Sequence, residues 1–334
     1  MFEKFFSKKD KSVSNRKYFE VLSLSGGGVY GLYSARIIQH LEEYFGDHIG
    51  EKVDLLVGTS IGGIIALGLS RKVKAEDIVK TFFDRSHLIF QEREKNYRTG
   101  LSGIGKFTSG MMRAKYDSSN LYNVIKSIID EDLVMADALY PVMITSYDLT
   151  TGSIRTFSCP VSSLGTLNDN DVSMVDVAMA TSAVPAMFPI HEIDGHRFVD
   201  GAVFANAPDM VAFKEAIFRM EVPFNKVKIL SVGTMMGRFF LEEKVRNDSG
   251  FISWGLNNRL PTLMVSAQNQ FTVSMMSDLL GDNYLRVDTS PSNSIRNINL
   301  SHLKKEDLNL ICKVADNSWK SILKDSEFLK NFGK

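Results

Sequence analysis

Residues 53–70 read VDLLVGTSIGGIIALGLS and decide the fold expected for this chain. An apolar run typical of a buried strand leads into Gly58-Thr59-Ser60-Ile61-Gly62, and an apolar run of helical length follows. A serine between glycines at such a junction is a nucleophile elbow, where a Cβ on either glycine would meet the strand or the helix. The turn exposes the serine hydroxyl and points the first helical amides toward developing negative charge. The stretch predicts a serine acyl hydrolase with Ser60 as nucleophile.

A glycine-rich loop lies upstream, where the strand-like stretch 19–24 runs into Ser25-Gly26-Gly27-Gly28 and then into a helix-like segment. Successive glycines let several backbone N–H groups face one point, and at a helix N-terminus such a loop stabilises negative charge. In an acyl hydrolase this is the oxyanion hole. The loop therefore supplies candidate oxyanion donors from Gly26, Gly27 and Gly28.

The same loop has an alternative interpretation, because Gly26, Gly28 and Gly31 also match the G-x-G-x-x-G pattern of dinucleotide-binding loops. That pattern requires an acidic residue about twenty positions on, at the end of the second strand. Asp47 precedes the second strand, and Asp54 lies before its core. The second strand ends instead in the serine turn, which favours the oxyanion hole over a nucleotide-binding module.

The third motif is Phe198-Val199-Asp200-Gly201-Ala202, which leads into Asn206-Ala207-Pro208. A glycine-rich amide loop followed by G-x-S-x-G and then by D-G-A resembles the patatin-like phospholipase family. The resemblance spans residues 19–208 and includes the Ala/Ser/Pro-rich stretch 178–189. By position it implies Ser60 as nucleophile, Asp200 as base without a histidine, and the Gly26, Gly27 and Gly28 amides as oxyanion hole. It also implies that Gly31, Gly58, Gly62 and Gly201 support these motifs.

The family resemblance implies a three-layer α/β fold with a mainly parallel central sheet flanked by helices. It also implies hydrolysis of fatty acyl esters of phospholipids or related lipids, with no cofactor and no metal. Some compact bacterial members are activated by cyclic oligonucleotides and damage the host membrane during phage defence. Similarity to that subgroup implies a cyclic nucleotide activator that binds away from Ser60 and shifts the enzyme between inactive and active states.

The chain departs from the family pattern at two positions of the glycine loop. Family members usually carry an acidic or similar polar residue at the position of Ser25 and a basic residue at the position of Tyr30. A tyrosine offers a hydroxyl donor but no fixed positive charge. Any electrostatic help that a basic side chain gives the loop is then either missing or supplied from elsewhere, and a catalytically silent patatin-like scaffold remains an alternative.

The histidines allow two alternative interpretations, a catalytic triad and a metal site. Ser60, Asp148 and His196 have the chain order of an α/β-hydrolase triad. The cluster His191, Glu192, Asp194 and His196 offers metal-ligand residue types, but it reads as a hairpin whose alternating side chains face opposite ways. We favour the Ser60–Asp200 dyad over both, because a histidine in such a hairpin is more often a surface or strand residue and no matching metal ligands lie elsewhere in the sequence.

Strand and helix signals alternate along the chain, as in a doubly wound parallel sheet. Strands are expected at 19–24, 55–57 and 227–233, and a hairpin at 141–148 and 154–157. Apolar spacing predicts helices at 32–45, 61–70, 75–83, 212–218, 263–279 and 308–323. We expect an N-terminal tail over 1–17, a catalytic core over 18–210, and the rest of the same domain with its C-terminal helices over 211–334.

Composition limits the partners. The 334 residues carry 39 Lys and Arg against 39 Asp and Glu, so the net charge is zero and a nucleic-acid partner is not expected. Two cysteines, Cys159 and Cys312, cannot form a disulfide framework, which suits a reducing cytoplasm. No apolar run approaches the roughly 18 residues of a membrane span. We expect a cytoplasmic protein that meets a phospholipid or membrane-surface substrate at the inner face of the membrane, with a homo-oligomer left open.

Two irregular segments break the alternation of strands and helices. Residues 91–116 contain several glycines, methionines and basic residues without a clear period, which is typical of a lid or interface loop. Residues 234–258 are the second such segment. They either line an acyl-binding groove or pack a C-terminal helix, and the sequence leaves both open.

Overall fold

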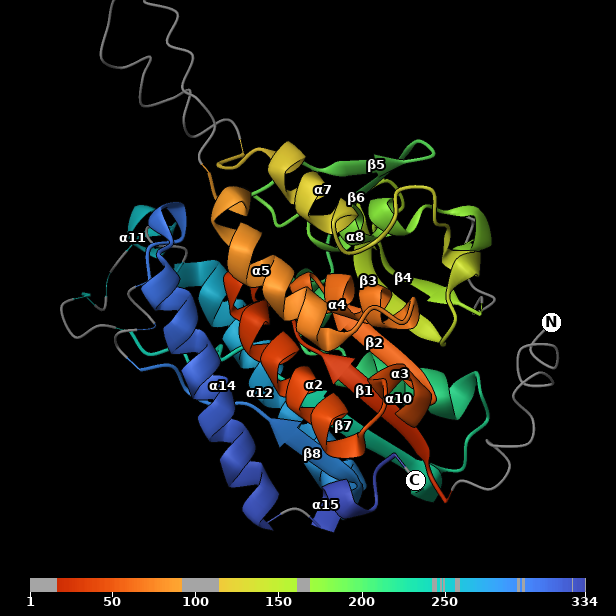
Figure 1. Cartoon of the computed structure of the whole chain (residues 1–334). Helices are drawn as coiled ribbons and strands as arrows, with labels where there is room; N and C mark the ends of the chain where they lie inside the picture. The colour runs from red at the N-terminus through yellow and green to blue at the C-terminus, as the bar shows by residue number, and fades with distance from the viewer. Residues whose placement is uncertain are drawn as a thin grey trace, which may run out of the picture.

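The computed structural model describes residues 17–91, 114–160, 169–241, 245–246, 248, 250–255, 259–292, 295, 298–325 and 327–333 (Figure 1). Its strands are β1 (Phe19–Leu24), β2 (Leu55–Thr59), β3 (Val142–Asp148), β4 (Ser153–Cys159), β5 (His191–Ile193), β6 (His196–Asp200), β7 (Val227–Val232) and β8 (Tyr284–Val287). The tail 1–16 and most of the irregular segment 91–116 lie outside the described residues.

Helices connect these strands. The α-helices are α2 (Gly31–Phe45), α3 (Ile49–Lys52), α4 (Ile61–Ser70), α5 (Ala75–Ile89), α7 (Ser118–Lys126), α8 (Met174–Thr181), α9 (Ala202–Ala205), α10 (Asp209–Phe218), α11 (Phe251–Gly255), α12 (Arg259–Leu280), α14 (Lys305–Asp325) and α15 (Glu327–Lys330). Short 3-10 helices are η2 (Gly28–Tyr30), η3 (Met135–Asp137), η4 (Asp169–Asp171), η5 (Phe224–Lys226), η7 (Gly281–Asn283) and η8 (Leu300–His302).

The strands form one sheet in the order β5-β6-β3-β2-β1-β7-β8, with β4 paired to β3 off this path. The pairs β3/β2, β2/β1, β1/β7 and β7/β8 are parallel, and the pairs of β3 with β4 and β6 and of β5 with β6 are antiparallel. The expected mainly parallel sheet is therefore confirmed, and an antiparallel edge is added to it. The expected hairpin is β3–β4, with Val142 opposite Cys159.

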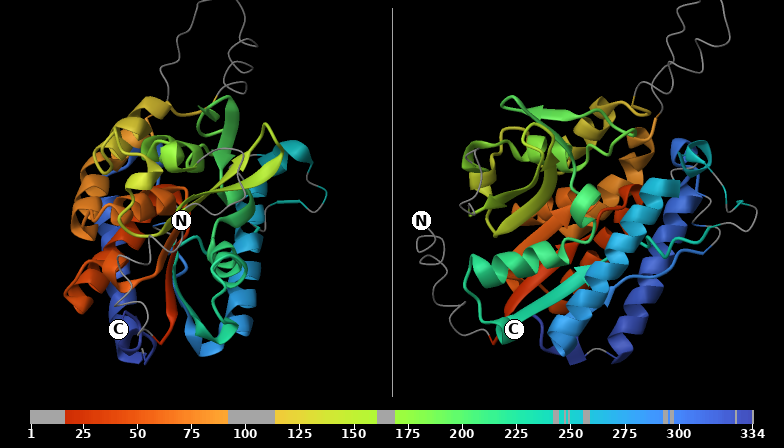
Figure 2. Two further views of the ribbon diagram at one scale, coloured as in Figure 1. Left: turned by 90° about the vertical axis from the view of Figure 1, so that its right-hand side faces the viewer. Right: turned by 180° about the vertical axis from the view of Figure 1, so that it is seen from behind.

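The central strands are apolar on both faces because helices cover both sides of the sheet. Side chains alternate between two cores: in β1, Leu22 and Leu24 face one, while Val21 faces the other. The first core contains residues of α2, α4, α5, α8 and α14, and the second contains residues of α10 and α12. Figure 2 shows α10 and α12 on the opposite side of the sheet from α2 and α5. These are the three layers expected from the sequence.

The strand ends bring the sequence motifs together. In the parallel part of the sheet, the glycine loop follows β1 and Ser60 follows β2, so both leave at the same edge. Thr59 of β2 is registered with Thr145 of β3, and Asp200 of β6 is registered with the next residue, Ser146. The last residues of β2 and β6 thus lie on the two sides of β3 at neighbouring positions. This topology brings residues 140 apart in the chain to one site.

Helix boundaries follow local chemistry. Helix α2 ends at Gly46, which has a left-handed backbone (φ 67°) and donates its N–H to the Glu42 carbonyl. Helix α8 begins after Ser173, whose hydroxyl accepts hydrogen bonds from the N–H groups of Val175 and Asp176. Among the described residues, no helix is both long and apolar enough to cross a bilayer.

Candidate active site

Ser60 adopts the strained backbone that the elbow motif predicts. Its φ of 54° and ψ of −127° are uncommon for a residue with a side chain. Its N–H donates to Thr181 Oγ1 at 2.8 Å, and its carbonyl accepts the N–H groups of Gly63 and Ile64 at 2.8 and 3.1 Å. Thr181 in turn donates to the Thr145 carbonyl at 2.6 Å. Hydrogen bonds on both sides of the serine therefore hold the strained turn in place.

The glycines around Ser60 are required by close backbone approach. A Cβ built on Gly58 would lie 2.3 Å from the Gly62 carbonyl oxygen, and one on Gly62 would lie 2.3 Å from the Leu24 carbonyl oxygen. Neither oxygen can move without shifting a strand or a helix. The strand β1, the elbow and the helix α4 therefore pack at distances that only glycine permits.

Gly31 and Gly201 have the same kind of role. A Cβ on Gly31 would lie 2.2 Å from Ile61 Cγ1, and one on Gly201 would lie 2.2 Å from Thr145 Oγ1. Gly31 thus allows α2 to approach the start of α4. Gly201 allows the turn after Asp200 to approach β3.

Asp200 lies at the end of β6 with only 1% of its surface exposed. Its Oδ1 accepts the Ala202 N–H at 2.8 Å, while the buried Oδ2 has no hydrogen-bond partner among the described residues. Burial raises the pKa of the Asp200 carboxyl to about 7, against smaller lowering effects of the Ser60 hydroxyl and the Ala202 N–H. The lowering effect of the Ser60 hydroxyl on this pKa places the two side chains next to each other. Such contacts often tighten only when substrate binds.

The glycine loop contributes two free amides. Gly26 donates its N–H to the Asn206 carbonyl at 2.9 Å, so this amide is already used. In the described part of the chain, no hydrogen bond uses the N–H of Gly27 or Gly28. Gly28 has a φ of 57°, a left-handed conformation that favours glycine. Of the three predicted oxyanion donors, the N–H groups of Gly27 and Gly28 are available. The prediction for Gly26 is wrong, because its N–H is hydrogen-bonded to the Asn206 carbonyl.

Ser60, Asp200, Gly27 and Gly28 line one cavity of about 320 Å³. The remaining wall is mainly apolar and comes from α4, α5, α7, the segment after α8, and α12. It includes Ile64, Phe82, Phe90, Leu121, Met187 and Phe188. Met236 and Val265 also line it, so part of the second irregular segment and α12 contribute to the apolar wall. A reactive polar end joined to an apolar chamber suits an ester with a long hydrocarbon chain.

The competing triad is not assembled around Ser60. His196 Nδ1 does pair with Asp148 Oδ2 at 2.8 Å, but neither residue lines the cavity that contains Ser60. Burial raises the Asp148 pKa, but hydrogen bonds from His196, Thr150 and Thr151 outweigh this effect, so the pKa is lowered. The pair belongs to the antiparallel edge of the sheet, where Asp148 is registered with Phe198.

The histidine hairpin does not converge on one point. His191 Nε2 contacts Asp176 Oδ1 at 2.9 Å, whereas His196 contacts Asp148. Within the described ranges, no group of three or more His, Cys, Asp or Glu side chains is placed to hold a metal ion. The nucleotide-binding alternative is also unsupported, since Asp54 Oδ2 accepts the Glu20 N–H at the start of β1 and β2, away from the loop.

A family model described as patatin-like phospholipase matches residues 22–213, which is more than half of the chain. The chain belongs to the patatin-like phospholipase family. Membership makes it a lipid acyl hydrolase by class and confirms the resemblance read from the three motifs. The matched region contains the glycine loop, the elbow and Asp200.

Three bacterial relatives of this patatin-like protein carry the name cGAMP-activated phospholipase. The Pseudomonas aeruginosa protein is 32% identical over 271 residues, which are 81% of this chain and 78% of that protein. The Vibrio cholerae protein is 29% identical and covers 86% of both chains. The Escherichia coli protein is 29% identical and covers 90% of this chain and 88% of its own.

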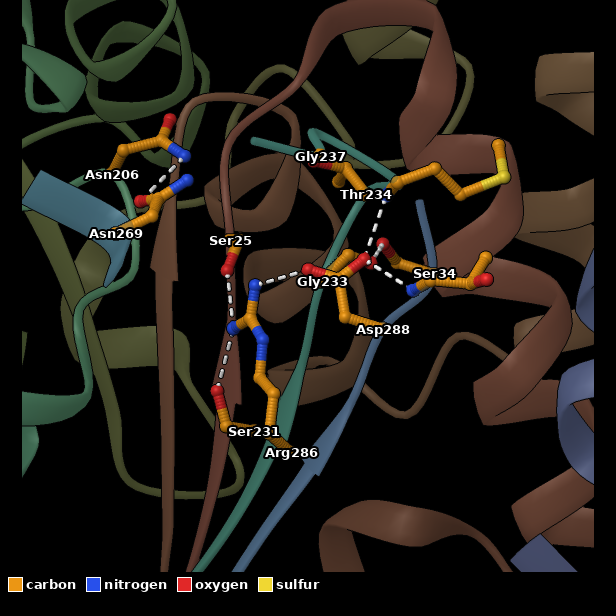
Figure 3. A network of polar contacts seen from close by, with 12 residues as sticks. Ser25, Ser34, Asn206, Ser231, Gly233, Thr234, Gly237, Asn269, Arg286 and Asp288 are labelled. Carbon is orange, nitrogen blue, oxygen red and sulfur yellow. Dashed lines mark hydrogen bonds and ion pairs between the residues drawn. The ribbon is translucent and has the colours of Figure 1, made fainter. Parts of the chain in front are cut away.

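The two departures from the family pattern have structural partners. The Tyr30 hydroxyl donates to the Ile295 carbonyl at 3.0 Å, and burial, with a smaller effect of Asp307, raises its pKa, so it brings no charge. The Ser25 hydroxyl is 2.9 Å from Arg286 Nη1 (Figure 3). A basic side chain thus reaches the loop from β8, some 260 residues further along the chain.

Besides Arg286, three further residues that shape the site were not predicted from the sequence. Thr181 and Asn206 lie in stretches that the motifs highlighted, yet no role was assigned to either. Thr234 lies at the start of the second irregular segment, and its hydroxyl donates to the Gly26 carbonyl at 2.7 Å. Each of the three is a polar residue inside or directly after an apolar run. Such a position indicates a buried side chain that needs a hydrogen-bond partner.

Proposed function

We propose that this protein hydrolyses fatty acyl esters of phospholipids through a Ser60–Asp200 dyad, under the control of a cyclic dinucleotide. The observation that carries the dyad is the buried Asp200 carboxyl. Its Oδ2 is unpaired, its pKa is raised to about 7, and it shares a cavity with the strained Ser60. An unpaired buried carboxylate destabilises a fold and therefore indicates a functional role.

The first half of the reaction forms an acyl-enzyme. Asp200 takes the Ser60 proton as Oγ attacks the ester carbonyl carbon, and the carbonyl oxygen becomes an oxyanion. The free N–H groups of Gly27 and Gly28 stabilise this charge, and one such donor is typically worth about 3 to 4 kcal/mol. The tetrahedral intermediate then collapses. Asp200 returns the proton to the departing lysolipid alcohol, and the acyl chain stays on Ser60.

The second half repeats these steps with water. Asp200 removes a proton from a water molecule, which attacks the acyl carbon, and the fatty acid leaves as Ser60 regains its proton. A carboxyl with a pKa near 7 is a much better base for this step than a free aspartate near ~3.9. Burial thus replaces the histidine of a conventional triad.

The apolar wall of the cavity supports a long acyl chain as substrate. Phenylalanine, leucine and methionine side chains surround the space next to Ser60. Burial of each CH₂ group contributes about 0.8 kcal/mol, so a fatty acyl chain would bind far better than a short ester. The family and the three relatives named as phospholipases support phospholipid as the source of that chain.

Activation by a cyclic dinucleotide rests on the relatives. All three are named as cGAMP-activated, and each matches most of this chain. An activator of this kind works by binding the active conformation more tightly than the inactive one. We infer that cGAMP or a similar cyclic dinucleotide activates this enzyme from a site separate from Ser60.

The test is fatty acid release from phosphatidylethanolamine/phosphatidylglycerol vesicles by the wild type and by Ser60→Ala, with and without cGAMP. We expect release by the wild type only when the nucleotide is present, and none from Ser60→Ala. A fluorophosphonate should label wild-type Ser60 under the same activating condition. Absence of both release and labelling with every cyclic dinucleotide tried would contradict the proposal and indicate a silent scaffold.

A further inference from the structure

Two side chains from distant parts of the sequence bind the Gly26 carbonyl oxygen. The Thr234 hydroxyl donates to it at 2.7 Å, and the Asn206 side-chain amide donates at 3.4 Å. Thr234 is completely buried and Asn206 is 2% exposed, so bulk water does not compete for this oxygen. By its length, the hydroxyl contact is the stronger of the two. It fixes the orientation of the peptide between Gly26 and Gly27.

The orientation of this peptide determines where the Gly27 N–H points. In a trans peptide the carbonyl and the following N–H face opposite directions. The only cis peptide among the described residues is Cys159–Pro160, so the peptide between Gly26 and Gly27 is trans. The Gly27 N–H therefore points away from Thr234 and Asn206. It has no partner in the described chain, and Gly27 lines the cavity with Ser60 and Asp200.

We propose that Thr234 is a positioning residue for the oxyanion hole. Its hydroxyl holds the Gly26 carbonyl on the side of the loop that faces away from the cavity. The Gly27 N–H on the other side is thereby directed at the reacting ester. The inference rests on the proposed function, in which Gly27 is one of the two oxyanion donors. Thr234 does not line the cavity, but it sets the direction of the Gly27 N–H, which does face the substrate.

Thr234 is itself held on both sides. The preceding residue, Gly233, donates its N–H to the Val287 carbonyl at 2.8 Å and accepts the Ser34 hydroxyl at 2.7 Å. The following residue, Met235, donates its N–H to Asp288 Oδ1 at 2.9 Å and has a left-handed φ of 57°. Such a conformation persists only where surrounding contacts enforce it. The threonine hydroxyl is thus presented from a rigid turn.

Thr234 also packs directly on the loop. A Cβ on Gly27 would lie 2.2 Å from Thr234 Oγ1, so the glycine backbone and the threonine are in close contact. This contact leaves no room for a side chain at position 27. The size and the hydroxyl of threonine both match the site, and this allows a sharp comparison between isosteric variants.

Arg286 connects the loop to the turn that carries Thr234. Its Nη1 is 2.9 Å from Ser25 Oγ, and its Nη2 is 2.7 Å from Asp288 Oδ2 (Figure 3). Asp288 is the residue that binds the Met235 N–H. The Arg286 guanidinium therefore links the glycine loop to the turn that carries Thr234. We expect this link to fix the position of Thr234 relative to the loop.

The test compares Thr234→Val with Thr234→Ser in the full chain, assayed on phospholipid vesicles with cGAMP present. Valine keeps the shape but removes the hydroxyl, and serine keeps the hydroxyl. Complete loss of one oxyanion donor lowers kcat by about 10²- to 10³-fold, so a misdirected donor should lower it by about 10- to 100-fold. We expect this loss in Thr234→Val with KM nearly unchanged, and near-wild-type kcat in Thr234→Ser.

A second measurement separates positioning from packing. A fatty alkyl trifluoromethyl ketone adds to Ser60 and forms an oxyanion, whereas a non-hydrolysable ether phospholipid forms none. In Thr234→Val, the affinity for the ketone should fall by the same factor as kcat/KM, and the affinity for the ether lipid should be unchanged. If Thr234→Val has no cooperative melting transition, Thr234→Ala replaces it, with the same expected loss.

Three results would overturn the inference: wild-type kcat in Thr234→Val, equal losses in the valine and serine variants, or a parallel loss of ether-lipid affinity. Each of these leaves the wild type active and so leaves the dyad proposal intact. Failure of the proposed function looks different, because the wild type itself would then release no fatty acid and Ser60 would remain unlabelled by fluorophosphonate.

Discussion

At the scale of single residues, the proposed dyad requires the Asp200 carboxyl to act as a base without histidine. The carboxyl is 1% exposed, and only one of its oxygens has a hydrogen-bond partner among the described residues. Burial disfavours the charged form and is the largest cause of its pKa of about 7. The same desolvation that makes it basic also makes the ionised carboxylate costly for stability.

The raised pKa predicts the pH dependence of the reaction. Asp200 must be ionised to accept the Ser60 proton, so kcat/KM should rise with pH and level off above a pKa of about 7. Initial rates of fatty acid release between pH 5 and 9 would measure it, with vesicle integrity checked at each pH. A profile that levels off near pH 4, as for an exposed aspartate, would contradict the assignment.

The same pKa predicts a stability effect with a definite sign. Between the ordinary value of 3.8 and about 7, the folded state binds the Asp200 proton more tightly than the unfolded state, so rising pH destabilises the fold across this window. The cost is on the order of a few kcal/mol above pH 7. Asp200→Asn should therefore melt at a higher temperature than wild type at pH 8.

Calorimetry at pH 8 and pH 5 would test this stability effect. The advantage of Asp200→Asn should shrink as the pH falls, because the wild-type carboxyl then becomes neutral as well. Asp148→Asn is a useful comparison, since the pKa of this carboxyl is lowered and the sign should reverse. An Asp200→Asn variant less stable than wild type at pH 8 would contradict this expectation, because it would mean that further contacts stabilise the ionised carboxylate.

At the scale of elements, the elbow depends on three backbone segments approaching closely. Gly62 meets the Leu24 carbonyl of β1, whereas nothing lies within 4 Å of a Cβ built on Gly46 at the end of α2. Gly62→Ala should therefore displace the elbow and abolish activity. In Gly46→Ala the added methyl group contacts no atom, so the free energy of unfolding should fall only by the cost of a left-handed alanine, about 1 to 2 kcal/mol.

Thermal unfolding and vesicle hydrolysis of these two glycine variants would provide the comparison. We expect Gly46→Ala to lose a few degrees in Tm and to retain its kcat. Gly62→Ala should lose activity even where it remains folded. Equal activity of the two variants would mean that the close approach at Gly62 does not determine the geometry of Ser60.

The elements also show what could be predicted from the sequence. The elbow, the glycine loop and the strands β1, β2 and β7 were readable because local glycines and apolar runs determine them. Helix α12 begins at Arg259, four residues before the predicted start, and α5 continues to Ile89, beyond the predicted end at 83. The short strand β8 gave no signal, although it carries Arg286.

The long-range bonds around the loop could not be predicted. The Gly26 N–H was expected to face substrate, but it binds the Asn206 carbonyl 180 residues away. No local pattern reports such a pairing, because it depends on how α9 and the turn after β7 approach β1. The absence of a basic residue at position 30 could be read from the sequence, whereas the contact between Arg286 and Ser25 is evident only in three dimensions.

At the scale of the whole molecule, the proposed activation by cGAMP implies a nucleotide site separate from Ser60. A ligand that binds only the folded protein stabilises it by about 2.7 kcal/mol at 100 times its Kd. cGAMP should therefore raise the Tm of Ser60→Ala as much as that of wild type. A linear dinucleotide of the same bases is the control. A Tm shift in wild type that is absent in Ser60→Ala would place the nucleotide in the catalytic cavity.

Comparison of Asp200→Asn with His196→Gln would show which residue serves as the base for Ser60. Both variants keep a hydrogen-bonding side chain, but each removes one candidate base. Fatty acid release from vesicles would be measured with saturating cGAMP, after matching the folded fraction of each protein. We expect Asp200→Asn to lose about 10²- to 10⁴-fold in kcat, as for removal of a general base, while His196→Gln stays near wild type. An active Asp200→Asn beside an inactive His196→Gln would contradict the dyad and reinstate the triad.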